Sequence, residues 1–191
     1  TPIVETLGAL QELIDAGKVR EIGCSNFTAD MLEDMVNVAS KNGLTPFSTV
    51  QNRYSVITRG PENDGVLDAC RKYNIGFVPY FPLESGLLTG KYRKGTELPS
   101  GSRLEEWAEL PHGAMFLQET MFDATEALID YAESKNRTIL ELGLSWLAER
   151  PEIPSVIAGA TTPEQVTANI AACSWTLNDE ERDDIEKLRP I

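Results

Sequence analysis

The stretch KVREIGC at residues 18–24 is the first of three short segments that decide the fold. The second is FSTV at 47–50 and the third is IGFVPY at 75–80, so the three begin about 28 residues apart. Each is expected to form a strand, and the third is apolar enough for a strand covered on both faces. A spacing of this size is typical of β/α units and predicts a parallel sheet with right-handed crossovers.

Helical patterns fill the intervals between the strands and continue to the end of the chain. Thr28 is suited to begin a helix that stops near Gly43, and a third helix carries Val66, Leu67 and Cys70. A fourth strand is expected at residues 155–158, with a helix starting after it at the capping box of Thr162. Four strands cannot close a barrel of eight. The residues alone therefore leave two architectures open, a small doubly wound sheet or half of a barrel.

Composition and charge exclude several classes of protein. The chain has 191 residues, 41% of them hydrophobic, and its 17 basic and 30 acidic residues give a net charge of −13. This charge argues against a nucleic-acid or anionic membrane surface as partner. No apolar run approaches the roughly 20 residues of a membrane span. Three widely spaced cysteines without a metal-ligand pattern indicate reduced, partly buried thiols in a cytoplasmic protein.

Candidate binding residues follow the strands, because parallel α/β folds bind ligands at the carboxyl ends of strands. They are Ser25 and Asn26 after the first strand, residues 51–53 beginning with Gln51 after the second, residues 80–83 beginning with Tyr80 after the third, and residues 159–165 after the fourth. Each has a structural alternative: a loop leading into a helix, a satisfied strand end, a core aromatic or a helix cap. Together they offer amides, a flat ring and a helix N-terminus, which suits a nucleotide with an aromatic head.

A long polar segment covers residues 84–118, and its part from 91 to 103 holds four basic residues against one acidic residue. Long loops of this kind are usually functional or disordered. Lys91 and Arg93 are candidates for an anionic ligand, although a solvated loop explains the charge equally well. The single histidine, His112, lies here and has no persuasive nucleophile or base beside it. Composition and spacing alone thus predict an α/β ligand-binding domain.

Four motifs resemble one family. GKVREIGCSNF at 17–27 resembles the aldo-keto reductase signature GKxRxIGxSNF, and VQNRYS at 50–55, PYFPLESGLLTGKYR at 79–93 and IAGATTPEQVTAN at 157–169 resemble three more family segments in family order. The similarity runs over nearly the whole chain. It implies a (β/α)8 TIM barrel that binds NADP(H) or NAD(H) and reduces aldehydes or ketones, its small-molecule carbonyl substrates, by hydride transfer.

The resemblance also implies roles for individual residues. Ser25, Asn26 and Gln51 match the residues that bind the nicotinamide carboxamide, and Tyr80 matches the aromatic that stacks on the nicotinamide ring. The remaining matches fall on the pyrophosphate loop and on the segment that binds the adenosine side: Leu83, Gly86, Leu88 and Lys91 on the former, and Gly159, Thr161, Thr162, Gln165 and Asn169 on the latter. Gly159 and Gln165 stand where many members carry Lys and Arg for a 2′-phosphate, which weakens the case for strict NADP preference.

The family's catalytic Tyr, Lys, Asp and His have no match in this sequence. The resemblance therefore implies that residues 1–191 are the C-terminal, cofactor-binding half of the barrel, about four β/α units resembling strands five to eight, with the long loop at about 84–118. We expect the isolated chain to be inactive, and its parent to be the reductase. The alternative is a non-catalytic nucleotide-binding or self-associating half-barrel. Exposed sheet edges predict self-association or pairing with the missing N-terminal half. A flat α/β domain of another family is a weaker third hypothesis.

Overall fold

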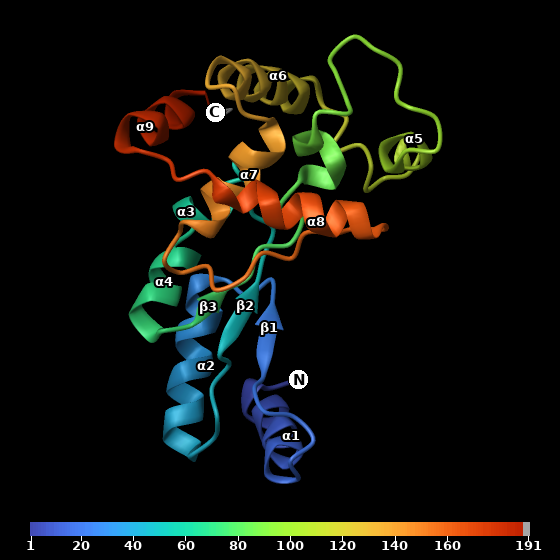
Figure 1. Ribbon diagram of the computed structural model, residues 1–191. Coiled ribbons are helices and arrows are strands. Elements are labelled where there is room, and N and C mark those ends of the chain that lie inside the picture. The colour runs from blue at the N-terminus through green and yellow to red at the C-terminus, as the bar shows by residue number, and fades with distance from the viewer. Residues whose placement is uncertain (189–191) are drawn as a thin grey trace. The chain divides into compact units, whose positions relative to one another are not determined.

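The computed structural model describes residues 1–188, which fall into two compact units (Figure 1). The first unit contains residues 1–53, 59–80 and 151–155, and the second contains residues 54–58, 81–150 and those from 156 onward. The first unit holds α1 (Ile3–Asp15), β1 (Gly23–Ser25), α2 (Ala29–Asn42), β2 (Thr49–Gln51), α3 (Gly60–Asn63), α4 (Val66–Tyr73) and β3 (Gly76–Phe77). The second holds the 3-10 helix η1 (Glu84–Thr89), α5 (Arg103–Trp107), α6 (Glu119–Ser134), α7 (Ile139–Ala148), α8 (Pro163–Ala171), the 3-10 helix η2 (Ala172–Ser174) and α9 (Asp179–Lys187).

The three strands of the first unit form one parallel sheet in the order β1-β2-β3. The strands are shorter than the sequence predicts. Pro79 has no N–H to give to a ladder and limits the length of β3. Pairing nevertheless continues beyond β3, since the backbone N–H of Val78 donates to the carbonyl of Val50 at 2.8 Å and that of Tyr80 to Asn52 at 3.1 Å. The predicted alternation of parallel strands and helices is thus confirmed for this unit.

The helix α2 begins and ends where the sequence places it. The Thr28 side chain accepts a hydrogen bond from the N–H of Met31 at 3.3 Å, and Gly43 ends α2 in the left-handed region at φ 65°. Leu32 and Met35 on this helix are fully buried. α2 packs against both α1 and α4 (Figure 1). Val66 and Leu67 on α4 are buried.

The predicted fourth strand at residues 155–158 is wrong for the part of the chain that the structure describes. No ladder forms there, and the N–H of Ala158 donates to the carbonyl of Val156 within the same segment. The chain meets the sheet earlier, where the N–H of Phe77 donates to the carbonyl of Glu152 at 2.8 Å. Pro151 and Pro154 flank that point and have no N–H to donate, so a regular ladder cannot propagate along this segment.

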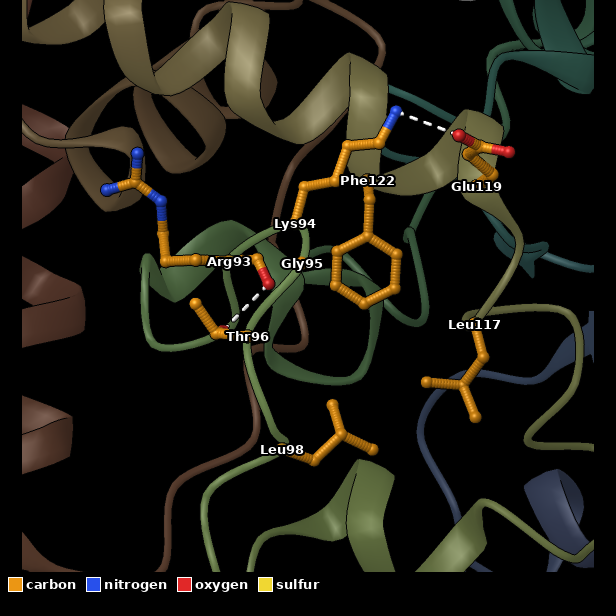
Figure 2. Close-up of a pocket in the computed structure, with 8 residues that line it drawn as sticks. All are labelled: Arg93, Lys94, Gly95, Thr96, Leu98, Leu117, Glu119 and Phe122. Atoms are coloured by element: carbon orange, nitrogen blue, oxygen red, sulfur yellow. Dashed lines mark hydrogen bonds and ion pairs between the residues drawn. The ribbon is translucent and has the colours of Figure 1, made fainter.

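The long polar segment of the second unit is more structured than a plain loop. It begins with η1, and Ser102 caps the short helix α5 by accepting from the N–H of Glu105. Residues 93–98 lie against the start of α6 and leave a cavity of about 380 Å³ between them, with Leu98, Leu117 and Phe122 among its lining residues (Figure 2). The Lys94 ammonium pairs with Glu119 at 3.0 Å at the edge of this cavity.

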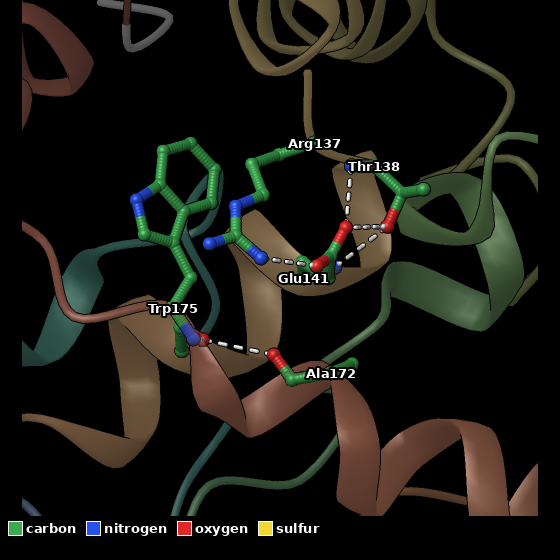
Figure 3. A network of polar contacts seen from close by, with 6 residues as sticks. Arg137, Thr138, Glu141, Ala172 and Trp175 are labelled. Carbon is green, nitrogen blue, oxygen red and sulfur yellow. Dashed lines mark hydrogen bonds and ion pairs between the residues drawn. The ribbon is translucent and has the colours of Figure 1, made fainter. Parts of the chain in front are cut away.

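A capping box fixes the start of α7 (Figure 3). The Glu141 carboxylate accepts from the backbone N–H of Thr138 at 2.8 Å, while the Thr138 hydroxyl oxygen accepts from the N–H of Glu141 at 3.2 Å. Arg137 donates to the same carboxylate at 2.9 Å. The backbone hydrogen bond from Thr138, and then the contacts with Arg137 and the Thr138 hydroxyl, lower the pKa of Glu141 below its ordinary value of 4.5.

The three thiols are free, as predicted, but they differ in exposure. Cys70 is buried and Cys24 half-buried, and desolvation raises the pKa of both thiols to about 12. Cys173 is exposed, which corrects the prediction that all three are partly buried. Across residues 1–188, no helix combines the length and the apolar character that crossing a bilayer requires.

The capping box of α7 predicts a pH-dependent contribution to stability. Glu141→Gln keeps a side chain that can bond the Thr138 N–H but removes the charge, so at pH 7 it should lower the free energy of unfolding by about 0.5–1 kcal/mol. Because the folded-state pKa lies below the unfolded one, this contribution is complete above pH 4.5 and is lost as the pH falls through the folded pKa. Urea unfolding of both proteins between pH 3 and 7 measures the difference. Glu109→Gln, which changes an exposed carboxylate, is the control. If the difference in the free energy of unfolding between wild type and Glu141→Gln stays constant below pH 4, the proposed pH dependence of the capping box is contradicted.

Candidate functional site

The first unit brings four predicted residues together at the carboxyl ends of its strands. Ser25 ends β1 and pairs in register with Gln51 at the end of β2. The Ser25 hydroxyl donates to the carbonyl of Gln51 at 2.9 Å, and the Tyr80 hydroxyl donates to the Asn26 side-chain oxygen at 2.8 Å. Ser25, Asn26 and Gln51 are exposed and Tyr80 is half-buried, so the cluster is open to a ligand.

Asn26 depends on a special backbone conformation. Its φ of 58° lies in the left-handed region, which asparagine tolerates better than most residues. Its N–H donates to the carbonyl of Gln51 at 2.9 Å, so the chain turns sharply out of β1 and keeps the Asn26 side chain beside Tyr80. The side-chain amide of Gln51 makes no hydrogen bond within the described residues and is available to a ligand.

Asn52 belongs to the same cluster, and it lies in the predicted segment 51–53, of which only Gln51 was assigned a role. Its side-chain nitrogen donates to the carbonyl of Phe27 at 3.0 Å, which ties the turn after β1 to the end of β2. Its side-chain oxygen is buried and accepts no hydrogen bond from the part of the chain that the structure describes. Asn52 therefore acts as a support for the Ser25-Asn26 turn.

The second unit carries the predicted pyrophosphate loop, residues 83–91. Gly86 has a φ of 101°, and a Cβ added to it would lie 2.9 Å from Cε and 3.3 Å from Nζ of Lys91. Glycine is favoured at this φ, and the end of the flexible Lys91 side chain occupies the space that a Cβ would take. The Lys91 ammonium stands 4.8 Å from the Tyr92 ring centroid and pairs with no carboxylate of residues 1–188. Its cationic group is available to an anion.

The other members of this loop are placed differently. Leu88 is fully buried and packs near Gly143, so its side chain cannot touch a cofactor, whereas Leu83 is half-buried. Arg93, which the sequence offered as a second phosphate ligand, binds Glu126 at 2.6 Å. This pairing leaves Lys91 as the better anion ligand of the two.

The N-terminus of α8 holds the predicted adenosine-side residues, most of which are exposed. The Thr162 hydroxyl oxygen accepts from the N–H of Gln165 at 3.3 Å, and the Gln165 side-chain oxygen accepts from the N–H of Thr161 at 2.6 Å. A Cβ on Gly159 would meet open space, so the glycine leaves room beside this turn. Asn169 is half-buried and lines a cavity of about 220 Å³ that is otherwise mainly apolar.

Sequence reasoning missed a buried polar pair in the second unit. The Ser55 hydroxyl donates to Glu84 Oε1 at 2.5 Å, and both residues are fully buried. No sequence pattern links the two residues, which are 29 positions apart. His112, by contrast, stacks edge-on against Trp107 with ring centroids 4.7 Å apart. Residues 1–188 contain no group of His, Cys, Asp and Glu side chains suited to a metal ion.

Comparisons with known proteins agree on one family. The profile of the Aldo/keto reductase family matches residues 1–190. The chain is 34% identical over 182 residues to the NADH-specific methylglyoxal reductase of Escherichia coli K12, covering 94% of this chain and 51% of that protein. It is 29% identical over 174 residues to the L-glyceraldehyde 3-phosphate reductase of the same bacterium, covering 90% and 49%. A putative voltage-gated potassium channel subunit beta of Schizosaccharomyces pombe is 31% identical over 191 residues, covering 99% and 52%.

The chain thus spans about half the length of the curated relatives it matches. The family profile nevertheless covers all but its last residue. The protein is a member of the aldo/keto reductase family.

Proposed function

We propose that this chain is the nicotinamide-cofactor-binding half of a reductase that converts aldehydes or ketones to alcohols with NADH or NADPH. The observation that carries the proposal is the cluster of Ser25, Asn26, Gln51 and Tyr80 at the carboxyl ends of parallel strands. These are the residues on which the family resemblance rests. Two of the relatives are named as reductases of carbonyl compounds.

The cluster fits a nicotinamide. A carboxamide needs both hydrogen-bond donors and acceptors, and the exposed side-chain amides of Asn26 and Gln51 supply both. The half-buried Tyr80 offers an aromatic ring for stacking, and its orientation is restrained by the hydrogen bond from its hydroxyl to Asn26. When bound, the cofactor supplies the hydride.

The second unit supplies groups for the anionic and adenosine parts of the cofactor. Lys91 has no carboxylate partner among the described residues and attracts phosphate oxygens, and the N-terminus of α8 favours negative charge. Gly159 and Gln165 bring no positive charge for a 2′-phosphate. We therefore propose that NADH binds at least as well as NADPH, in line with the NADH-specific relative.

We propose that the proton for the alcohol comes from a group outside the 191 residues. The catalytic Tyr, Lys, Asp and His motifs of the family have no match in this sequence. His112 is not an obvious substitute, because it packs against Trp107 and belongs to a different segment from the nicotinamide cluster. We propose that the parent protein provides the acid on further β/α units, and that this chain alone binds and orients the cofactor.

A second candidate function is a self-associating module without catalysis, favoured by the exposure of α8. No residue of α8 is buried, and Ile170 and Val166 are 72% and 49% exposed. Ile157 adds a third exposed aliphatic side chain to the second unit. Exposed apolar groups of this kind mark protein contacts. The partner would be a second copy or the remaining half of the barrel.

Cofactor binding tests the first proposal. The quenching or enhancement of NADH and NADPH fluorescence should give saturable binding to the wild-type chain. Lys91→Ala should weaken it by about tenfold, the effect of losing one charge-assisted contact of about 1.4 kcal/mol. Lys135→Ala, which removes an exposed lysine elsewhere in the second unit, is the matched control. Equal affinity of both variants would remove Lys91 from the site.

A turnover assay tests the proposal that this chain lacks the proton donor. The purified 191-residue chain with NADH or NADPH and 4-nitrobenzaldehyde should show no oxidation of the nucleotide above the rate without protein, followed at 340 nm. Robust reduction would show that these residues contain a proton donor after all, and would reject the proposal that the acid lies elsewhere.

Self-association tests the second function. Ile170→Glu places a charge on the exposed side of α8 and should shift the chain toward monomer in multi-angle light scattering at tens of micromolar. Thr167→Glu adds the same charge to a polar position of the same helix and should leave the mass unchanged. A wild-type chain that is already monomeric would exclude this function.

A further inference from the structure

The pyrophosphate loop has an unusual backbone. Glu84 and Ser85 lie in the left-handed region with φ of 46° and 55°, and Phe81, three residues earlier, has a φ of 52°. For residues other than glycine this conformation is unfavourable, so neighbouring groups must hold the segment in place. Gly86, with its φ of 101°, follows directly. The sharp turn is therefore maintained by contacts and not by the local preference of its residues.

The hydroxyl of Ser55 supplies one such contact, and all of its hydrogen-bonding sites are occupied. It donates to Glu84 Oε1 at 2.5 Å and accepts from the N–H groups of Ile57 at 3.1 Å and Thr58 at 2.9 Å. A hydroxyl has one donor and two acceptor sites, so all three are used. The N–H of Ser55 also donates to the carbonyl of Thr58 at 2.9 Å. Ser55 is thus a fixed point in a tight turn.

Burial makes the hydrogen bond between Ser55 and Glu84 costly to lose. Glu84 and Ser55 are both fully buried, and a carboxyl group in that environment requires hydrogen-bond donors. Moving Glu84 away would leave two buried polar groups without this partner, which is costly. The pair therefore fixes the beginning of the loop, while the buried Leu87 and Leu88 fix its middle.

The fixed loop in turn leads into the backbone of Lys91. Gly86 lies at a φ of 101° that favours glycine, and the end of the flexible Lys91 side chain occupies the space beside it. We propose that Ser55 and Glu84 are positioning residues that set the loop for the pyrophosphate of the cofactor through Gly86 and Lys91. This inference rests on the proposed cofactor-binding function, and neither residue touches the cofactor itself.

Four variants and NADH titration test the proposal. Ser55→Ala and Glu84→Ala should each raise the dissociation constant about tenfold, and the double variant should add little, because both remove the same contact. Glu84→Gln keeps an oxygen that accepts from Ser55 and should restore affinity to within about threefold of wild type. Ser134→Ala and Glu109→Ala are matched controls, since both remove exposed groups outside this loop contact.

Hydrogen exchange provides a readout that does not depend on cofactor. Amides 84–90 should exchange faster in Ser55→Ala than in wild type, while the amides of α6 should be unchanged. Circular dichroism and urea unfolding establish that each variant is folded. If Glu84→Ala or Ser55→Ala does not fold, Ser55→Cys, which keeps the volume and weakens the hydrogen bond, takes its place.

The outcomes separate this inference from the proposed function. Wild-type binding together with unchanged affinity in the folded Ser55 variant overturns the inference and leaves the function intact. Unchanged exchange at 84–90, or a Glu84→Gln variant as weak as Glu84→Ala, also overturns it. A wild-type chain that binds neither NADH nor NADPH overturns the proposed function, and the positioning role for pyrophosphate with it.

Discussion

The parallel register of β1, β2 and β3 is the constraint on which the cluster of Ser25, Asn26, Gln51 and Tyr80 depends. Ser25 lies opposite Gln51, and the pairing continues through Tyr80, whose N–H donates to Asn52. All strands run in one direction, so their carboxyl ends meet and the polar residues that follow them become neighbours although they are 25 or more residues apart in sequence. A slip of one residue would turn the side chains of a strand to the opposite face and separate Ser25 from Gln51.

A different constraint governs the second unit, where side chains hold the backbone in an unfavourable conformation. The loop at residues 83–91 has no ladder to follow, and its turn depends on buried groups such as Ser55 and Glu84. Specific contacts can hold an anion-binding loop in a single conformation before a ligand arrives. Such pre-organisation lowers the entropic cost of binding. A buried carboxyl group in a loop proposed to bind phosphate is consistent with this arrangement, because it holds the loop without facing the anion.

Local sequence patterns were sufficient for the elements whose determinants are local. Thr28 and Gly43 bound α2 as predicted, and the 28-residue spacing gave the parallel order, since caps and hydrophobic periodicity act within a few residues. The segment 155–158 was mispredicted because its apolar residues suit a strand, yet a strand also needs a neighbour with free ladder groups. Burial of Glu84 and its partner Ser55 could not be predicted, because the two residues are 29 positions apart and no sequence pattern links them.

The charge distribution shows most clearly that contacts between distant residues cannot be predicted from local sequence. The basic residues at 91–94 stand out in an acidic chain and suggest a positive patch, but α6 returns with Glu119, Asp123 and Glu126 to pair with Lys94 and Arg93. These acids cancel most of the local positive charge, so the island exerts little long-range attraction at physiological salt. What remains is one ammonium, on Lys91, with no carboxylate partner in the described chain. An anion approaching this loop would therefore meet this one ammonium at short range, beside Gly86, and the net charge of the chain does not determine that contact.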